Sequence, residues 1–544
     1  MPTILNSRLA KLRALVVDDL QTMRQNIRTQ LGQLGIEHVD QAATPDDAIK
    51  FIRNANYDVI VCDYNLNKET NGQQMLEFLR SNKMLSPTAM FFMVTAESSY
   101  DSVASTAEFQ PDAYMVKPLT GGRIADRIER LLDKQQVLKP ITDRLDLKDL
   151  SGAIAECDKV AQSAPKWIVD VLKLKSSAAF DLGDIEAARK VYAQALELRN
   201  DLVWARLGLA RCHQAGGKLD EAKIIVESVL EKNNQYIGAY DLLAQIAESQ
   251  GKDQEALEAL NKSYEVIPSA RRSRLVGDAA YRVGDLEQAR TAFTKAVSHT
   301  RGSLTAQASD ALSLAQVHVD AREPTMALTV LSTAARDYQD DSRFSARQAI
   351  IAAQAFSGLG DMESAKAAFE SAMEAAGEVR ANADSLDLAK AAFCVGLNEE
   401  GARIMTKAIK ADHENARLVA FARRVLKDTG NDAMIEKIVE ESISAGTLIV
   451  DEATRLMRDG KFDASLAKLE EALIATPDNT GVLLAAAQLH LLWMSQKGLD
   501  RSYVERVNGY LAQLDGLMPN SERVAKMYRF LRETLVKVAR EADR

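Results

Sequence analysis

Short apolar runs alternate with segments of helical periodicity along the first 139 residues. The runs of strand length are Ala14–Val17, Val39–Ala43, Val59–Cys62, Met90–Val94 and Tyr114–Val116. Apolar residues recur every three to four positions over Leu20–Leu34, Asp46–Arg53, Gln73–Leu85, Tyr100–Phe109 and Ile124–Leu132. Five strands in strict alternation with five helices predict an α/β fold, a doubly wound five-stranded parallel sheet with helices on both faces.

Polar residues end several of these strands, and they are the candidate chemistry. Asp18 and Asp19 follow the first strand, Asp63 ends the third, Thr95 follows the fourth, and Lys117 follows the fifth. Parallel strands end at one edge of the sheet, where such folds bind ligands. Clustered carboxylates raise one another's pKa unless a cation joins them, and oxygen donors with room for water suit Mg²⁺. Asp63 could then act as a nucleophile toward phosphorus, while Lys117 and Thr95 contact phosphoryl oxygens.

The ordered set Asp18-Asp19, Asp63, Thr95-Ala96 and Lys117-Pro118 resembles the receiver domains of two-component response regulators, which have a flavodoxin-like fold. The resemblance implies that Asp63 is the phosphoacceptor and that Lys117 and Thr95 take part in catalysis. It also implies that Asp18, Asp19, Asp63 and the backbone carbonyl of Asn65 hold Mg²⁺, and that Thr95 and Tyr114 form a switch pair. The phosphoryl group would come from a sensor histidine kinase or phosphotransfer protein. A homodimer through the receiver stays open.

The segment after Asp63 departs from the receiver pattern. Many receivers carry a Met-Pro pair here, whereas this chain reads Asp63-Tyr64-Asn65-Leu66-Asn67, and the loop up to Gly72 is slightly extended. The departure affects the expected rigidity of the loop and the expected dephosphorylation rate, but not the assignment of the acceptor.

A second pattern, with a period of about 34 residues, fills the rest of the chain. Its glycines are Gly183, Gly217, Gly251, Gly284, Gly360 and Gly460. A small residue follows each glycine by five positions, at Ala188, Ala222, Ala256, Ala289, Ala365 and Ser465. A bulky residue such as Tyr192, Phe293 or Phe369 often comes four positions later, on the same helical face. The glycine permits a tight turn, and the small residues let neighbouring helices approach.

This pattern resembles the tetratricopeptide repeat, a helix-turn-helix unit that stacks into an all-α superhelical solenoid. The resemblance implies a groove that holds a protein or peptide partner. We therefore expect two domains, a receiver over residues 1–139 and a helical repeat domain over residues 140–544. Units between residues 300 and 450 are irregular, so the repeat number there stays open. The last segment, Ser521–Arg544, is expected to be a capping helix.

The junction at Gln135–Asp146 contains one proline and no glycine, which argues against a flexible tether. Pro140 is expected to open a new helix, so that the receiver's last helix packs near the first repeat. Phosphorylation is expected to act through the face formed by the fourth helix, fifth strand and fifth helix of the receiver.

Composition and charge exclude several classes of function. With 47% hydrophobic and 27% charged residues the chain is typical of soluble globular proteins, and no apolar run is long enough to enter a membrane. The N-terminus lacks a secretory signal, and the four cysteines are scattered, so a cytoplasmic location is expected. The net charge of −9 disfavours direct binding of nucleic acid.

These observations predict a bacterial response regulator. It would accept a phosphoryl group on Asp63 and transmit this signal to a repeat surface that regulates a signalling partner. The alternative is a phosphate sink or constitutive scaffold, in which the receiver drains phosphate from a kinase while the repeats localise it. No second catalytic group is evident, so a separate output enzyme is not expected. The kinase, partner, pathway, oligomeric state and direction of regulation stay open.

Overall fold

The structure is a computed structural model of the 544-residue chain. It describes residues 8–66, 71–86, 88–96, 111–300, 305–338, 342–376, 383–412, 415–498 and 500–518, and a few positions between 523 and 534. The chain divides into two compact units, Met1–Asp310 and Ala311–Arg544. None of the described helices combines the length and the apolar character needed to cross a membrane.

The first unit opens with a five-stranded parallel sheet in the order β2-β1-β3-β4-β5. The strands are β1 (Arg13–Val17), β2 (His38–Ala42), β3 (Val59–Asp63), β4 (Met90–Thr95) and β5 (Ala113–Val116). The central strand β3 is buried along its whole length, as the continuous apolar run predicted. All five predicted strands are confirmed, each shifted by no more than a residue or two at its ends.

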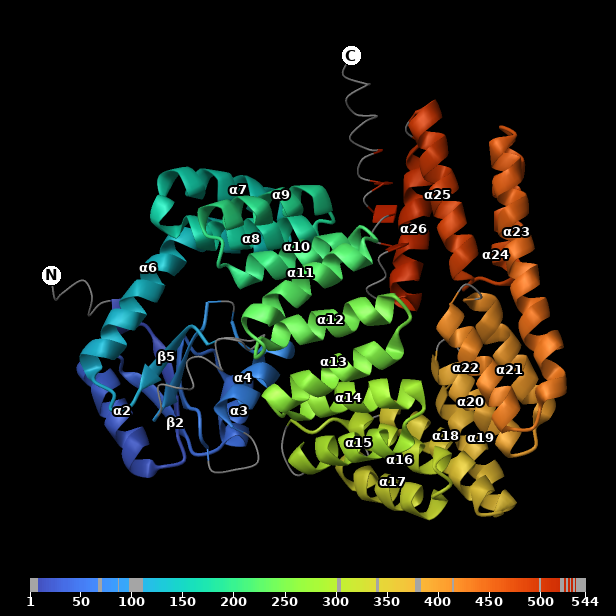
Figure 1. The fold of residues 1–544 in the computed structure, drawn as a ribbon, viewed down its shortest axis with the longest axis horizontal. Coiled ribbons are helices and arrows are strands. Elements are labelled where there is room, and N and C mark those ends of the chain that lie inside the picture. Colours follow the sequence, from blue (N-terminus) through green and yellow to red (C-terminus); the bar gives the residue numbers. More distant parts are fainter. Residues whose placement is uncertain are drawn as a thin grey trace. The chain divides into compact units, whose positions relative to one another are not determined.

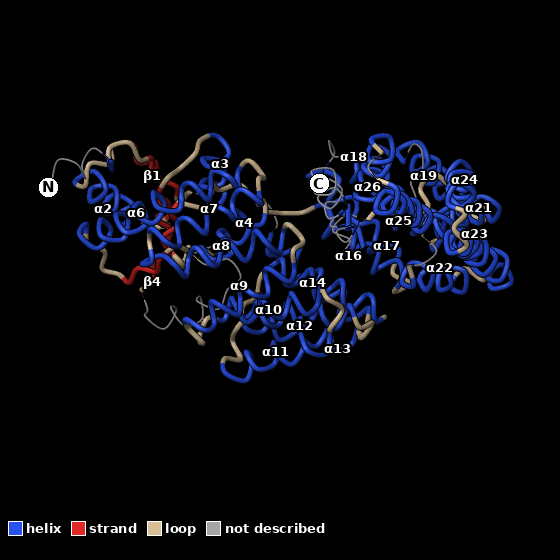
Figure 2. The backbone as a smooth tube through the Cα atoms, turned by 90° about the horizontal axis from the view of Figure 1, so that it is seen from above, coloured by secondary structure: helices blue, strands red, loops and turns tan. Residues whose placement is uncertain are grey.

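Helices cover both faces of the sheet (Figure 2). They are α2 (Gln21–Gln33), α3 (Pro45–Asn54), α4 (Gly72–Ser81) and α6 (Gly121–Asp146). Alternate residues of β1 point to opposite faces, so Ala14 and Val16 join the core under α2 and α6, while Leu15 and Val17 join the core under α3 and α4. The predicted doubly wound fold is confirmed. The helix predicted at Tyr100–Phe109 and the loop Asn67–Thr70 lie outside the described residues.

Helix α6 runs through the predicted junction without a break (Figure 1). Pro140 lies in its interior, so the expectation that this proline opens a new helix is wrong. A proline here removes one backbone hydrogen bond. Its neighbours Leu138 and Ile141 are buried against the next helix, α7 (Leu150–Ser163), and this apolar burial stabilises the continuous helix. The boundary predicted between residues 139 and 140 therefore falls inside α6.

Helical pairs complete the first unit. They are α8 (Ile168–Asp181) and α9 (Ile185–Leu198), α10 (Val203–Ala215) and α11 (Leu219–Lys232), α12 (Ile237–Ser249) and α13 (Asp253–Val266), α14 (Ala270–Val283) and α15 (Leu286–Thr300). A short 3₁₀ turn, Pro165–Trp167, precedes α8. The turn glycines of these pairs have φ between 72° and 85°, a conformation that glycine adopts without a steric penalty.

The second unit continues the same architecture after α16 (Ala308–Asp320), which crosses the boundary between the units. Its helices are α17 (Pro324–Tyr338), α18 (Ser342–Gly358), α19 (Met362–Ala376), α20 (Ala383–Cys394), α21 (Asn398–Ala411), α22 (Ala416–Asp428), α23 (Glu441–Arg458), α24 (Phe462–Ala475), α25 (Thr480–Lys497) and α26 (Arg501–Leu517). A 3₁₀ turn, Asp432–Met434, and a π-helical segment, Glu436–Glu440, separate α22 from α23.

The irregular units between residues 300 and 450 keep the turn conformation while changing its residue. Gly396 and Gly430 have positive φ, like the glycines of the regular units. Between α16 and α17 the left-handed position belongs to Arg322, with φ 61°, which a residue with a Cβ adopts at an energetic cost. The repeat geometry therefore persists where the glycine that marks it in the sequence is absent.

The small residues of the repeat pattern occupy the contacts between helices. Ala188, Ala222, Ala256, Ala289 and Ala365 are completely buried, and the bulky Phe293 and Phe369 are buried beside them. At the corresponding position of α24 the serine is also buried, and its hydroxyl donates a hydrogen bond of 2.7 Å to the carbonyl of Ala453 in α23. Serine therefore keeps the close packing and adds one polar contact.

Replacing Ser465 with Ala should lower the free energy of unfolding by about 1 kcal/mol, because a buried carbonyl loses its hydroxyl donor. Urea unfolding followed by circular dichroism measures the change. Ser332→Ala is the matched control, since Ser332 is an exposed helical serine, and it should change stability by less than about 0.5 kcal/mol. Equal stability of the two variants would show that the hydroxyl contributes nothing net.

The predicted capping helix at Ser521–Arg544 is described at only a few positions. Among them, Val524 and Leu531 are buried against Leu483 of α25 and Leu511 of α26. The remainder of that segment lies outside the described residues, so the capping helix stays a prediction.

Candidate functional site

Three predicted acidic residues meet at the carboxyl edge of the sheet. The carboxylates of Asp18, Asp19 and Asp63 each offer an oxygen atom within 4.8 Å of the others. Asp18 and Asp63 are 1% and 7% exposed, and Asp19 is half-buried. The parallel pairing of β1 with β3 aligns Val17 with Cys62, so the next residue of each segment, Asp18 and Asp63, is brought beside the other.

Lys117 joins this group from the end of β5. Its Nζ atom lies 3.0 Å from Oδ2 of Asp63 and 3.2 Å from Oδ2 of Asp18. The backbone N–H of Lys117 donates to the carbonyl of Thr95 at the end of β4, which fixes the lysine beside the neighbouring strand. Among the described groups, one ammonium thus sits within ion-pair distance of two buried carboxylates.

The pKa values of Asp63 and Lys117 are shifted by burial and by the contacts between these groups. Burial is the largest influence on Asp63 and raises its pKa; Lys117 opposes this rise, Asp18 adds to it, and the net shift is upward. Burial alone lowers the pKa of Lys117, but Asp63 and Asp18 together outweigh it and raise the value. Lys117 therefore remains a cation, held in place by the two carboxylates.

Two further contacts fix the first strand end, and sequence reasoning did not identify them. Arg24 of α2 donates from one terminal nitrogen to the backbone carbonyls of Asp18 and Asp19, at 2.6 and 2.9 Å. The N–H of Leu20 donates to Oδ1 of Asp18 at 2.9 Å. The sequence does contain a signal for the first of these contacts, namely an arginine one helical turn after an acidic pair.

The remaining predicted residues lie near this edge. Thr95 ends β4 and is 1% exposed. In the register of β4 with β5, Met93 pairs with Tyr114, which places Tyr114 and Thr95 on the same face of the sheet. Asn65 follows Asp63 by two positions and is exposed. Their roles in switching and in metal binding stay predictions.

The donor set fits a small, hard divalent cation. All three clustered side chains present oxygen, and Lys117 is the one ammonium with ion-pair contacts to them among the described residues. Oxygen ligands that leave room for water are the coordination that Mg²⁺ prefers. Carboxylates buried this close together also repel, so a divalent cation would relieve the repulsion.

The thiol beside the site has no part in this chemistry. Cys62 is completely buried, and its Sγ atom lies 3.2 Å from the carbonyl oxygen of Asp63. Burial first, and then the charges of Asp63 and Asp18, raise the pKa of the thiol well above its usual value. Cys62 therefore stays a neutral side chain of the core.

Comparison with known proteins agrees with this geometry. Residues 14–129 match the response regulator receiver domain, and residues 179–246, 237–269 and 350–378 match the tetratricopeptide repeat. A chemotaxis protein CheY of Pseudomonas aeruginosa is 30% identical over 123 residues, which are 23% of this chain and 98% of that protein. Chemotaxis protein CheY-3 of Vibrio cholerae is 25% identical over 134 residues, which are 25% of this chain and 99% of the relative.

Among solved structures, a tetratricopeptide repeat protein from Parabacteroides merdae is similar to 45% of this chain and 94% of its own, with 14% identity and a TM-score of 0.31. The receiver match spans the sheet and its acidic edge, and the repeat matches fall on helices of both units. The chain belongs to the response regulator receiver family, with a receiver domain followed by tetratricopeptide repeats.

Proposed function

We propose that Asp63 accepts a phosphoryl group from a phosphohistidine of a separate histidine kinase or phosphotransfer protein. The observation that carries the proposal is the contact of Lys117 with Asp63 and Asp18, at 3.0 and 3.2 Å, within a cluster of three carboxylates. This arrangement supplies a cation beside the carboxylate of Asp63 at the carboxyl end of β3.

The transfer step forms one bond and breaks one. A carboxylate oxygen of Asp63 forms a bond to phosphorus, the phosphorus–nitrogen bond of the donor breaks, and its electron pair leaves with the imidazole. The ammonium of Lys117 then pairs with a phosphoryl oxygen, and the hydroxyl of Thr95 hydrogen-bonds another. Mg²⁺, held by Asp18, Asp19, Asp63 and the carbonyl of Asn65, would neutralise charge on the phosphoryl oxygens.

The repeats are the output in this proposal. They bind a protein or peptide partner of a signalling pathway, and the phosphorylation state of Asp63 controls that binding. Stacked helical pairs present extended surfaces of this kind, which supports a binding role rather than a second enzymatic one. We further propose that the protein acts in the cytoplasm and does not bind nucleic acid directly, consistent with its net charge of −9.

A small acyl phosphate tests the chemistry without the kinase. The full chain is incubated with acetyl phosphate and Mg²⁺, and its intact mass is measured. We expect a gain of one phosphoryl group that hydroxylamine removes, as for any acyl phosphate. Excess EDTA should suppress it by about tenfold or more, because binding Mg²⁺ offsets the charge repulsion between donor and site. Labelling that persists in EDTA would contradict the metal assignment.

Partner binding tests the output. Immobilised chain is exposed to native lysate with Mg²⁺ and with or without beryllofluoride, which mimics a phosphoryl group on an aspartate. A protein whose capture changes in the wild type, and does not change in Asp63→Asn, supports regulated binding. An identical set of captured proteins in both conditions would instead favour the phosphate sink or constitutive scaffold.

A further inference from the structure

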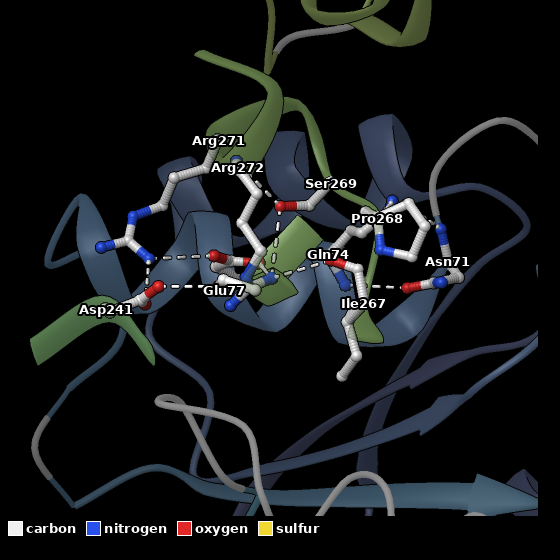
Figure 3. A network of polar contacts seen from close by, with 10 residues as sticks. Asn71, Gln74, Glu77, Asp241, Ile267, Pro268, Ser269, Arg271 and Arg272 are labelled. Atoms are coloured by element: carbon white, nitrogen blue, oxygen red, sulfur yellow. Dashed lines mark hydrogen bonds and ion pairs between the residues drawn. The ribbon is translucent and has the colours of Figure 1, made fainter. Parts of the chain in front are cut away.

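Helix α4 of the receiver contacts the start of α14 in the repeats (Figure 3). The Nη1 atom of Arg271 lies 3.3 Å from Oε1 of Glu77, and the Nη1 atom of Arg272 lies 3.4 Å from Oε2 of the same carboxylate. Glu77 is 5% exposed and Arg272 is 3% exposed. A carboxylate of the receiver is therefore buried between two arginines that follow it by almost 200 positions in the chain.

A second contact links the same two helices through Gln74. Its Nε2 atom donates to the carbonyl of Pro268 at 3.1 Å. Its Oε1 atom accepts from the N–H of Asn71, and its own N–H donates to Oδ1 of Asn71, which closes the capping box of α4. One side chain thus fixes the first turn of the receiver helix and also binds the repeat turn.

The first turn of α4 is in direct contact with the strand that carries Asp63. The N–H of Gly72 donates to the carbonyl of Tyr64 at 2.9 Å. A Cβ atom at Gly72 would lie 2.3 Å from the carbonyl oxygen of Asp63, so the helix approaches this strand as closely as a glycine allows. A displacement of Tyr64, which follows β3 directly, therefore moves Gly72 and with it the first turn of α4, which carries Gln74.

The contact is polar and incompletely packed. Nε of Arg272 is buried without a hydrogen-bond partner among the described residues. A cavity of about 340 Å³ lies alongside and is lined by Phe78 and Asn82 of the receiver and by Leu275 and His299 of the repeats. A permanent interface would fill such a space and satisfy such a donor. These features are typical of a contact that opens.

We propose that the turn between α13 and α14, together with the first turn of α14, is a docking surface for the chain's own receiver, and that phosphorylation of Asp63 opens this contact. The inference rests on the proposed function. The polar contacts of this surface depend on the positions of Gln74 and Glu77 on α4, so a shift of the first turn of α4 breaks them. Opening frees Arg271 and Arg272, whose guanidinium groups then become available to a partner.

Hydrogen exchange of the full chain tests the contact through two reporter amides. The N–H of Arg272 donates to Oγ of Ser269, and the N–H of Ser273 donates to its carbonyl, both in the first turn of α14. Glu77→Gln keeps the shape of the side chain and removes its charge. It should speed exchange of these amides by about tenfold. The matched control is Glu37→Gln, at an exposed glutamate of the receiver, which should leave both amides unchanged.

Beryllofluoride with Mg²⁺ tests the coupling in the wild type. It should speed exchange at the same two amides, and it should have no effect in Asp63→Asn. Unchanged exchange in Glu77→Gln overturns the docking contact, provided that circular dichroism shows the variant folded. Should beryllofluoride alter exchange over residues 59–66 but leave Arg272 and Ser273 unchanged, the coupling is wrong and the phosphoacceptor assignment stands.

The two proposals fail in different ways. A chain that neither binds beryllofluoride at residues 59–66 nor takes phosphate from acetyl phosphate contradicts the proposed function. The comparison of Glu77→Gln with Glu37→Gln still decides whether the receiver docks on α14, because it needs no phosphoryl group.

Discussion

A chain with Asn in place of Asp63 should take up no phosphoryl group from acetyl phosphate. The amide keeps the size of the carboxylate but lacks the charged oxygen that attacks phosphorus, so labelling should fall by at least about a hundredfold. Intact mass after incubation with the donor and Mg²⁺ measures the loss. The fold should survive, because Asn removes one of three mutually repelling carboxylates.

The control for this prediction is Asp126→Asn, at an exposed aspartate of α6 in the same domain. It should label like the wild type. If Asp63→Asn still gains one phosphoryl group, Asp18 or Asp19 is the acceptor in its place. Peptide mapping of the labelled chain separates these cases, since Asp63 and the acidic pair lie on different proteolytic fragments.

The acidic edge could be predicted because local sequence determines it. A strand such as β3, which is apolar up to its last residue, is expected to be buried on both faces, and its terminal Asp63 then lies at the carboxyl edge. Parallel pairing places Asp18 and Lys117 at the same edge. The sequence pattern therefore determines which side chains meet, whereas the distances of 3.0 Å and 3.2 Å from Lys117 to Asp63 and Asp18 depend on how the strand ends pack in three dimensions.

The course of α6 could not be predicted from its proline. The helix-opening preference of Pro140 is a local effect, and the burial of Leu138 and Ile141 against α7 is a tertiary one that outweighs it. The turn at Arg322 is a second case in which tertiary packing outweighs a local preference. A non-glycine residue adopts the left-handed conformation there because the packed helices on either side require it.

The contact of Glu77 with Arg271 and Arg272 had no usable signal in the sequence. The two segments are separated by 194 positions or more, and their meeting depends on how the receiver and the repeats are joined through α6. One feature of α4 agrees with a polar contact at this place, because Gln73 and Glu77 are buried polar residues beside its apolar face. Sequence reasoning assigned coupling to another face of the receiver, part of which lies outside the described residues.

Replacing Gly208 with Ala should lower the free energy of unfolding by about 2–3 kcal/mol, the second large effect that we expect. A Cβ atom at this position of α10 would lie 2.2 Å from the ring of Tyr192 in α9. The ring cannot withdraw easily, because Tyr192 is 8% exposed and packs edge-on against Trp204 at 6.1 Å between centroids. Thermal unfolding followed by circular dichroism measures the loss.

Gly238→Ala separates this clash from the general effect of adding a methyl group to a helix. A Cβ atom at Gly238 would find its nearest neighbour at 3.5 Å, so this variant should be as stable as the wild type or slightly more stable. Shortening the ring by Tyr192→Leu should make Gly208→Ala less harmful, with a coupling energy of about 1 kcal/mol or more between the two sites. Additive losses would mean that Gly208 is required for backbone reasons and not for the close approach of α9 to α10.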